Sequence, residues 1–299
     1  MFDLESALIA LGFSVLLMFV VWALHLRDED ASIVDPVWGP AIFGTGIVYG
    51  IAAGADLRGA RLVCALVVGA WALRLGLHLA RRHSMTGEDR RYREMREARG
   101  AAWWWQDLFV VFFLQAGLAW VVALPLMAAV TGTLSLGVLG WLGVLVALFG
   151  FAFESVADGQ LAAFKRKESA YGASAGSRST PGESEEGQPS GSHSGSTPGT
   201  GAEVQARGVM DKGLWRYSRH PNYFGETVVW WGIGLVAIAQ GALWAAPGPI
   251  VITFMLLKVS GVTLTEKSIT ERRPAYRDYI QSTSAFLPRP PRATDSSQD

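Results

Sequence analysis

The sequence predicts an all-α, polytopic membrane protein with about seven transmembrane helices in one bundle. Half of its 299 residues are hydrophobic, and runs of about 20 apolar residues recur from one end of the chain to the other. A run of this length matches the ~30 Å hydrocarbon core of a bilayer, whereas helices of soluble cores are shorter and carry a polar stripe. The loops between the runs also differ sharply in charge, as a membrane topology requires.

Seven apolar runs of the sequence are candidate transmembrane spans. The first run is preceded by Asp3 and Glu5 rather than by the positive residues of a signal peptide, so we expect it to be a retained helix. The only cysteine, Cys64, lies in an apolar run, which excludes an intrachain disulfide. The predicted spans are residues 5–26, 34–53, 61–80, 105–130, 135–160, 223–241 and 246–264.

Most basic residues fall on one side of this topology. The loop 81–102, the segment 165–219 and the C-terminal tail are rich in Lys and Arg, whereas the loops 131–134 and 242–245 contain neither. The positive-inside rule makes the basic side cytoplasmic and leaves the N-terminus outside. We therefore expect a multi-pass protein of the inner (cytoplasmic) membrane. Its formal net charge of +0 argues against a nucleic-acid partner.

One membrane domain is expected, built from residues 5–165 and 208–280. The segment 168–207 between them is rich in Gly, Ser, Thr, Pro and acidic residues and lacks apolar periodicity. Such a segment cannot bury enough area to offset its chain entropy, so we predict a disordered cytoplasmic insertion. A tolerated loop is the simpler interpretation, and a regulatory or docking role is the alternative. Residues 288–299 are expected to form a flexible tail.

The most informative stretch, Gly213 to Trp231, follows this insertion. Pro221 suits the first turn of a helix, where its missing N–H is not needed, so the sixth span is expected to begin there. Asn222, Glu226 and Trp230 then follow at i, i+4 and i+8 and share one helix face. An ionisable Glu226 one turn into a span is costly unless it is paired or hydrated, and therefore marks a functional site.

Positive charge precedes this helix. Arg216, Arg219 and His220 come just before the free N–H groups of the helix start, and together they predict an anion-receptive corner on the cytoplasmic side. A soluble, phosphate-bearing cofactor would arrive there. The alternative interpretations are that Asn222 caps the helix and that Glu226 is a structural partner for an Arg.

The stretch resembles the C-terminal signature of steroid 5α-reductases, sterol reductases and isoprenylcysteine methyltransferases. It is most similar to the bacterial 5α-reductase-like proteins of the DUF1295 group. The resemblance covers nearly the whole chain except the insertion and the last few residues. The other motifs that carry it are Asp35-Pro-Val-Trp38-Gly39, Arg74, Gly87-Glu-Asp-Arg-Arg-Tyr92, Glu154 to Lys165, Thr265-Glu-Lys267 and Glu271-Arg-Arg-Pro-Ala-Tyr276-Arg-Asp-Tyr279.

This resemblance implies a seven-helix fold that encloses NADPH from the cytoplasmic side. The reaction that it implies is reduction of a carbon–carbon double bond in a lipophilic substrate, either an enone or a sterol-like isoprenoid. It also implies that Asn222 and Glu226 hold the nicotinamide carboxamide. The further implied cofactor contacts are Glu154 and Asp158 at the ribose or adenine, Arg74, Lys165 and Arg272 at the phosphates, and Trp215, Tyr217 and Tyr276 along the cleft.

The substrate half departs from the steroid enzymes. Those enzymes polarise the substrate carbonyl with a Gln–Glu pair on the second span and a Tyr on the third. Here the second span, Ile33 to Ile51, contains no Gln or Glu, and Trp71 aligns with that Tyr. Glu226, Tyr49 and Asp35 are the catalytic candidates, and Gln106 and Gln115 are further substitutes for the missing pair.

Two other functions remain open at this stage. Isoprenylcysteine methyltransferases share the fold and bind S-adenosylmethionine, but their last segment usually opens with a Glu-Glu pair where this chain has Glu266-Lys267. A transporter or scaffold would favour polar residues on discontinuous spans and an internal repeat, and neither is recognisable. His78 and His83 are five residues apart, a spacing that does not favour a metal site. The oligomeric state is left open.

Overall fold

The computed structural model describes residues 1–176, 208–259, 261–263, 266, 269, 270, 273 and 275–292. The chain divides into two compact units. Unit 1 comprises Met1–Phe151 and Glu226–Met255, and unit 2 comprises Ala152–Gly225 and Leu256–Asp299. The chain passes between the two units three times, after Phe151, Gly225 and Met255, and each junction falls inside a helical segment.

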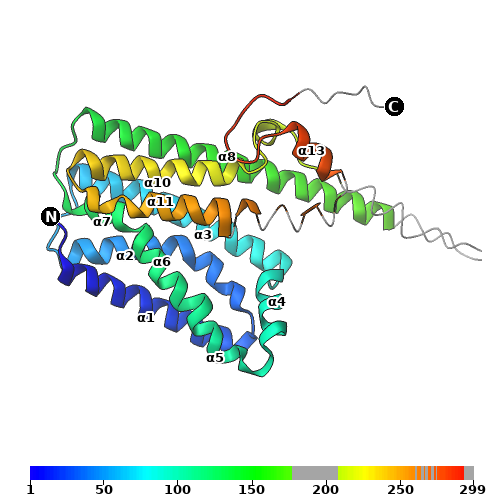
Figure 1. Cartoon of the computed structure of the whole chain (residues 1–299), viewed down its shortest axis with the longest axis horizontal. Coiled ribbons are helices and arrows are strands. Elements are labelled where there is room, and N and C mark those ends of the chain that lie inside the picture. The colour runs from blue at the N-terminus through cyan, green and yellow to red at the C-terminus, as the bar shows by residue number, and fades with distance from the viewer. Residues whose placement is uncertain are drawn as a thin grey trace, which may run out of the picture. The chain divides into compact units, whose positions relative to one another are not determined.

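The described residues form helices and connecting turns, with no strand among them (Figure 1). The longer helices are α1 (Leu4–Asp28), α2 (Trp38–Ala52), α3 (Gly59–Thr86), α4 (Arg90–Arg99), α5 (Trp103–Asp107), α6 (Leu114–Val122), α7 (Leu124–Thr131), α8 (Val138–Gly176), α10 (Pro221–Ala239), α11 (Pro247–Phe254) and α13 (Tyr276–Ser282). The short or irregular turns are η1 (Ala31–Val37), η2 (Gly100–Ala102), η3 (Leu108–Phe113), η4 (Gly213–Arg216), η5 (Leu243–Ala245) and η6 (Met255–Val259).

Five helical stretches of the described chain are long and apolar enough to cross a membrane. They are Leu4–Asp28, Ala31–Ala52, Gly59–Thr86, Arg90–Val122 and Val138–Ala170, and each overlaps one of the first five predicted spans. α10 and the shorter apolar stretch Leu243–Val259 lie where the sixth and seventh spans are expected, but they are not among these five. The prediction of an all-helical, multi-pass membrane protein is therefore confirmed, whereas the count of seven spans is not.

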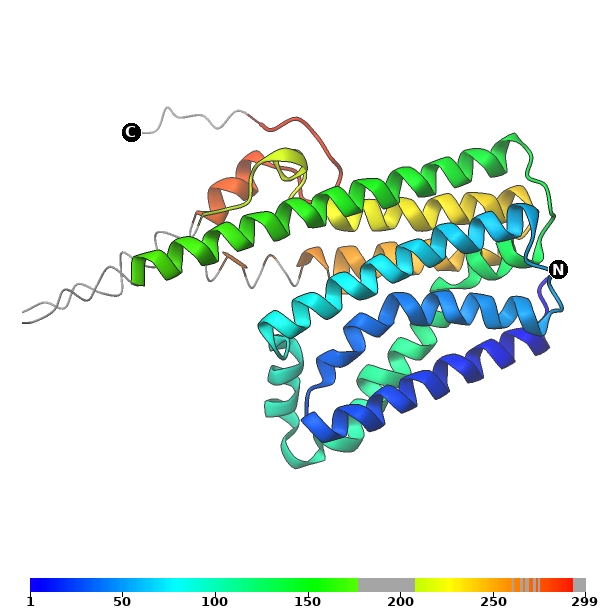
Figure 2. The same ribbon diagram turned by 180° about the vertical axis from the view of Figure 1, so that it is seen from behind.

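Unit 1 is a helical bundle in which α1, α2 and α3 pack in chain order and later helices pack back against them. α1 packs on α2 and α2 on α3, while α7 contacts both α2 and α3 and α6 contacts α1 (Figure 2). α8 and α10 approach closely at Gly232, where an added Cβ would lie 2.4 Å from the backbone nitrogen of Ala147. Small residues at such a crossing allow two membrane helices to pack backbone to backbone.

The fourth span of unit 1 is irregular. It contains η3, a π-helical segment that starts directly after Asp107. Asp107 is fully buried, and its Oδ2 lies 2.6 Å from Nε2 of His25 on α1. The indole N–H of Trp22 donates to the other carboxylate oxygen of Asp107 at 3.0 Å. π-Helical segments often accompany polar or functional positions in a helix.

Unit 2 joins the second part of α8, the segment before α10, and the C-terminal residues. The Ser218 hydroxyl donates to the carbonyl of Phe286 at 2.8 Å, and the Arg289 backbone N–H donates to the carbonyl of Tyr217 at 2.9 Å. α8 continues to Gly176, so the first residues of the segment predicted as an insertion, 168–176, are helical. The rest of that segment, 177–207, and the tail residues 293–299 lie outside the described residues.

Candidate functional site

The segment that leads into α10 is tied to other parts of unit 2. Gly213 has a φ of +63°, a backbone conformation that favours glycine, and it begins η4. Trp215 in η4 is buried, and its indole N–H donates to the carbonyl of Ala157 on α8 at 3.0 Å. The Tyr279 hydroxyl on α13 donates to the carbonyl of Trp215. Trp215 therefore anchors the approach to α10 on both sides.

Arg219, two residues before α10, is 8% exposed, and all three of its guanidinium nitrogens donate hydrogen bonds. Its Nε and Nη2 donate to the two carboxylate oxygens of Glu266 at 2.7 and 3.0 Å. Its Nη1 donates to the carbonyls of Ile280 and Thr283 at 3.0 and 2.5 Å. Bidentate, charge-assisted pairs of this kind are strong and geometrically specific. The guanidinium that was predicted to meet an anionic cofactor thus belongs to an internal network.

His220 belongs to the same network. Its Nε2 lies 3.1 Å from Oε1 of Glu266, and its ring stacks on Tyr223 with centroids 5.3 Å apart. Burial alone would raise the pKa of Glu266, but the hydrogen bonds from His220 and Arg219 outweigh it and hold that pKa below the usual value. Glu266 is therefore held as a carboxylate between two donors.

Asn222 lies inside the first turn of α10, so it is not the residue that caps the helix. Its Nδ2 donates to Oδ1 of the buried Asp158 on α8 at 3.2 Å. Its Oδ1 is also buried and has no hydrogen-bond partner among the described residues. The contact with Asp158 fixes the amide orientation and leaves an acceptor open.

The other residues predicted to bind a cofactor in unit 2 differ in exposure. Glu154 is buried on α8 one turn before Asp158, so the two carboxylates share a helix face. Lys165, further along α8, is exposed, and Tyr217 is 43% exposed. Tyr276 is buried, and burial raises its pKa. Arg272 lies outside the described residues.

A cavity of about 710 Å³ also lies within unit 2, between the approach to α10 and α13. Its volume is in the range of small-molecule pockets. Lys212 and Arg216 contribute positive charge to its wall, and Asp211 and Asp278 contribute negative charge. Of the three residues of the predicted anion-receptive corner, Arg216 lines this cavity of mixed charge, and Arg219 and His220 do not.

In unit 1 the predicted residues fall in separate places. Glu226 is buried on α10, with 7% exposure. The guanidinium of Arg74 lies 5.9 Å from the centroid of the Phe151 ring, a cation–π contact. Tyr49 on α2 is buried, and its hydroxyl accepts the backbone N–H of Asp3, near the N-terminus, at 3.0 Å.

Asp35, the third catalytic candidate, meets a tyrosine and an arginine. The Tyr92 hydroxyl donates to Oδ1 of Asp35 at 2.7 Å, and Nη2 of Arg91 donates to Oδ2 at 3.2 Å. The Gln115 amide donates to the Tyr92 hydroxyl at 3.4 Å. Two of the residues proposed for the missing Gln–Glu pair, Asp35 and Gln115, are therefore joined through Tyr92.

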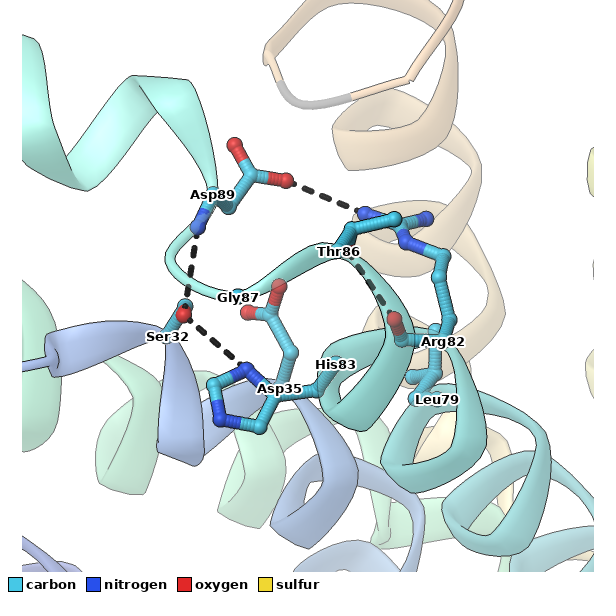
Figure 3. A pocket seen from close by; sticks show the side chains of 8 residues that line it. All are labelled: Ser32, Asp35, Leu79, Arg82, His83, Thr86, Gly87 and Asp89. Carbon is cyan, nitrogen blue, oxygen red and sulfur yellow. Dashed lines mark hydrogen bonds and ion pairs between the residues drawn. The ribbon is translucent and has the colours of Figure 1, made fainter. Parts of the chain in front are cut away.

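Figure 3 shows the small pocket beside Asp35. The Ser32 hydroxyl accepts the backbone N–H of Asp89 at 3.2 Å and lies 3.2 Å from Nδ1 of His83. Burial would raise the pKa of Asp89, but its hydrogen bond and charge interaction with Arg91 bring it below the usual value. The pocket volume of about 20 Å³ is enough for one water molecule. The lining residues are Ser32, Asp35, Leu79, Arg82, His83, Thr86, Gly87 and Asp89.

Comparison with known proteins decides the family. A family described as "Protein of unknown function (DUF1295)" matches residues 21–283. The chain belongs to this family. The match includes every motif on which the resemblance rests, from Asp35 to Tyr279, so the DUF1295 prediction is confirmed. The relation to steroid and sterol reductases stays a prediction.

The chain is also similar to a protein of a eukaryote. An uncharacterised protein of Schizosaccharomyces pombe, C594.04c, is 27% identical over 309 residues, which span 96% of this chain and 81% of the relative. No solved structure matches the chain significantly. Within the part of this DUF1295 protein that the structure describes, no group of three or more His, Cys, Asp and Glu side chains could hold a metal ion.

Sequence reasoning missed three sets of residues in this DUF1295 chain. Glu266 was noted only as a family marker, although it holds Arg219 and His220. The partnership of Tyr92 with Asp35 was not anticipated, nor was that of His25 with Asp107. A signal existed for His25 and Asp107, because both lie inside predicted spans and ionisable residues there are costly unless they find a partner.

Proposed function

We propose that this DUF1295 protein is a membrane-embedded, NADPH-dependent reductase of a carbon–carbon double bond in a lipophilic substrate. The observation that carries the proposal is the open, buried acceptor of Asn222. An unsatisfied buried acceptor costs about 1–3 kcal/mol, so a ligand that donates to it is favoured. The carboxamide of a nicotinamide ring has two N–H donors that suit this oxygen.

The carboxylates of α8 support the same assignment. Glu154 and Asp158 are both buried, and a carboxylate is an acceptor for the hydroxyl groups of a ribose. Asp158 also orients Asn222 through its Nδ2. The hydrogen-bonded pair of Asn222 and Asp158 would thus position both the nicotinamide and a ribose of the cofactor.

Arg219 and His220 take a different role in this proposal. To bind a phosphate, the Arg219 guanidinium would have to leave Glu266 and two backbone carbonyls. We therefore assign Arg219, His220 and Glu266 as positioning residues that hold the start of α10. Within unit 2, Arg216, Lys212 and the exposed Lys165 remain the candidates for phosphate contacts.

NADPH would supply the hydride, and the chain's own residues would orient the nicotinamide and exclude bulk water. The charge pattern of the loops supports a cytoplasmic approach for the cofactor, with the N-terminus outside. We place the protein in the inner membrane on the same ground.

The test is thermal unfolding of the purified protein in detergent with NADPH, NADH or S-adenosylmethionine. A ligand that binds only the folded state stabilises it by about 2.7 kcal/mol at a concentration 100 times its Kd. We expect NADPH to raise the Tm, and Asn222→Ala to remove that rise. Gln240→Leu, which removes an amide from the other end of α10, is the control and should respond like the wild type.

The same experiment separates the alternatives. A rise in Tm with S-adenosylmethionine and none with NADPH would assign the chain to the methyltransferases. No rise with any of the three cofactors would refute both enzyme assignments and favour a transporter or scaffold.

A further inference from the structure

Two hydrogen-bond donors on α10 are buried in unit 1 without an acceptor. They are the hydroxyl of Thr227, a residue with 6% exposure, and the indole N–H of Trp230, with 0% exposure. Neither atom has a hydrogen-bond partner within the described part of the chain. A buried donor without an acceptor within the protein is rare in native proteins, and an acceptor on a bound molecule would satisfy it.

Thr227 differs from other threonines in the helices of unit 1. Helical threonines commonly donate to the carbonyl four residues earlier. Thr45, Thr131 and Thr253 do so, at 2.7, 2.8 and 2.6 Å. Thr227 has the same option at the carbonyl of Tyr223 and does not use it. Its hydroxyl is therefore available to another acceptor.

Trp230 differs in the same way from several other tryptophans. The indole groups of Trp22, Trp120 and Trp215 each donate to an oxygen at 2.9 to 3.1 Å. Trp230 instead packs edge to face with Trp71 of α3, with ring centroids 5.2 Å apart and an interplanar angle of 89°. A contact between an N–H and an aromatic face is weaker than a hydrogen bond to oxygen.

The two donors lie three residues apart, so they share one face of α10. Glu226, one turn before Trp230, lies on the same side. The neighbouring side chains Val229 and Ile233 are apolar and fully buried. In such surroundings a hydrogen bond is electrostatically stronger than in water, and an unused donor is correspondingly costly.

We propose that the Thr227 hydroxyl and the Trp230 indole N–H bind an acceptor oxygen, such as a carbonyl, on a lipophilic substrate. The pair would replace the carbonyl-polarising groups that this chain lacks at Ile33 to Ile51. The catalytic part of this inference rests on the proposed reductase function. In that reaction a hydride from NADPH and a proton from water add across the double bond, and the two donors hold the negative charge that gathers on the conjugated oxygen.

The probe for this site is isophorone, a small lipophilic enone, with an isotopically labelled carbonyl. Infrared difference spectra of the protein in detergent report its carbonyl stretch, with and without NADP⁺. We expect a bound band at lower frequency than in detergent alone, because two donors weaken the carbonyl bond. Methylcyclohexane, which has no oxygen, should not compete for the site.

Three variants identify the donors. Thr227→Val should lose a large part of the frequency shift and weaken binding about tenfold, the loss expected of one hydrogen bond. Thr227→Ser keeps a hydroxyl and should keep the shift, and Trp230→Phe should lose the other part of it. Thr45→Val removes a hydroxyl that is bonded within its own helix, and it should leave the shift unchanged.

A second readout needs no ligand. Because Thr227 makes no bond within the described residues, Thr227→Val should unfold at the same temperature as the wild type or higher, whereas Thr45→Val should unfold at a lower one. A lower Tm for Thr227→Val, or a carbonyl band that Thr227→Val and Trp230→Phe leave in place, would overturn the proposal. So would the absence of a shifted band in the wild type.

The outcomes for the donor pair and for the reductase are separable. A shifted carbonyl band that depends on Thr227, without any stabilisation by NADPH, would keep the oxygen site and refute the reductase. Stabilisation by NADPH without a shifted band would do the reverse.

Discussion

Arg219 and Glu266 form a bidentate ion pair in which Nε and Nη2 of the arginine meet the two carboxylate oxygens at 2.7 and 3.0 Å. The two residues are 47 positions apart in the chain, and the pair is supplemented by His220 at 3.1 Å. Glu266 therefore joins the residues before α10 to the C-terminal part of unit 2.

Removal of one partner of this pair should destabilise the protein. Arg219→Ala leaves the Glu266 carboxylate half-buried without its main partner, and breaking a buried pair in this way costs about 3 kcal/mol. Unfolding in detergent measures the loss. Arg90→Ala breaks the exposed pair with Glu94 and should cost less than about 1 kcal/mol. Equal losses in the two variants would contradict the structural role of Arg219.

The same pair predicts a pH dependence. Hydrogen bonds from His220 and Arg219 lower the pKa of Glu266 in the folded state below its ordinary value of 4.5. The stability that Glu266 contributes is then fully present above about 4.5 and is lost as the pH falls through the lower, folded-state pKa. Glu266→Gln should be less stable at neutral pH and lose less stability on acidification. Parallel acid-unfolding curves for the variant and the wild type would refute this.

The buried contact between His25 and Asp107 predicts a non-additive double mutant. Asp107→Leu alone removes the partner of His25 and one of the two acceptors of the Trp22 indole, and should cost about 3 kcal/mol. His25→Leu with Asp107→Leu removes both polar groups and should recover part of this loss. A double-mutant cycle measures the coupling, and strictly additive losses would show that the two side chains do not interact.

The close approach of α8 and α10 predicts a steric effect at Gly232. A Cβ there would lie 2.4 Å from the backbone nitrogen of Ala147, so Gly232→Ala should force the helices apart and cost about 1–3 kcal/mol. Gly117 on α6 has open space at the Cβ position, and Gly117→Ala should be neutral or slightly stabilising. Unfolding of both variants in detergent tests the contrast.

Several features of the fold could be predicted from the sequence because they depend on local properties. Apolar runs predict the first five spans, since bilayer thickness sets their length. Pro221 correctly predicts the first residue of α10, since proline suits the first turn of a helix. Asn222 and Asp158 were each proposed to bind the cofactor, and in the structure Nδ2 of Asn222 lies 3.2 Å from Oδ1 of Asp158.

The side-chain contacts of the candidate site depend on pairing between distant segments, and the residue pattern carries little information on such pairing. Arg219 was interpreted as a free cation because a charge near a helix start does not reveal its partner. That partner, Glu266, and the carbonyls of Ile280 and Thr283 come from the end of the chain. The contact of Asp35 with Tyr92 likewise joins residues 57 positions apart.

The bonds from Arg219 to the carbonyls of Ile280 and Thr283 have a consequence for biosynthesis. The chain is synthesised from its N-terminus, so α10 is made before the residues that bind Arg219 have been translated. The N-terminal end of α10 can take its final form only after Ile280 and Thr283 have left the ribosome. A premature stop codon or a fusion partner placed before Thr283 would therefore leave the Arg219 guanidinium without these carbonyl acceptors in an incomplete protein.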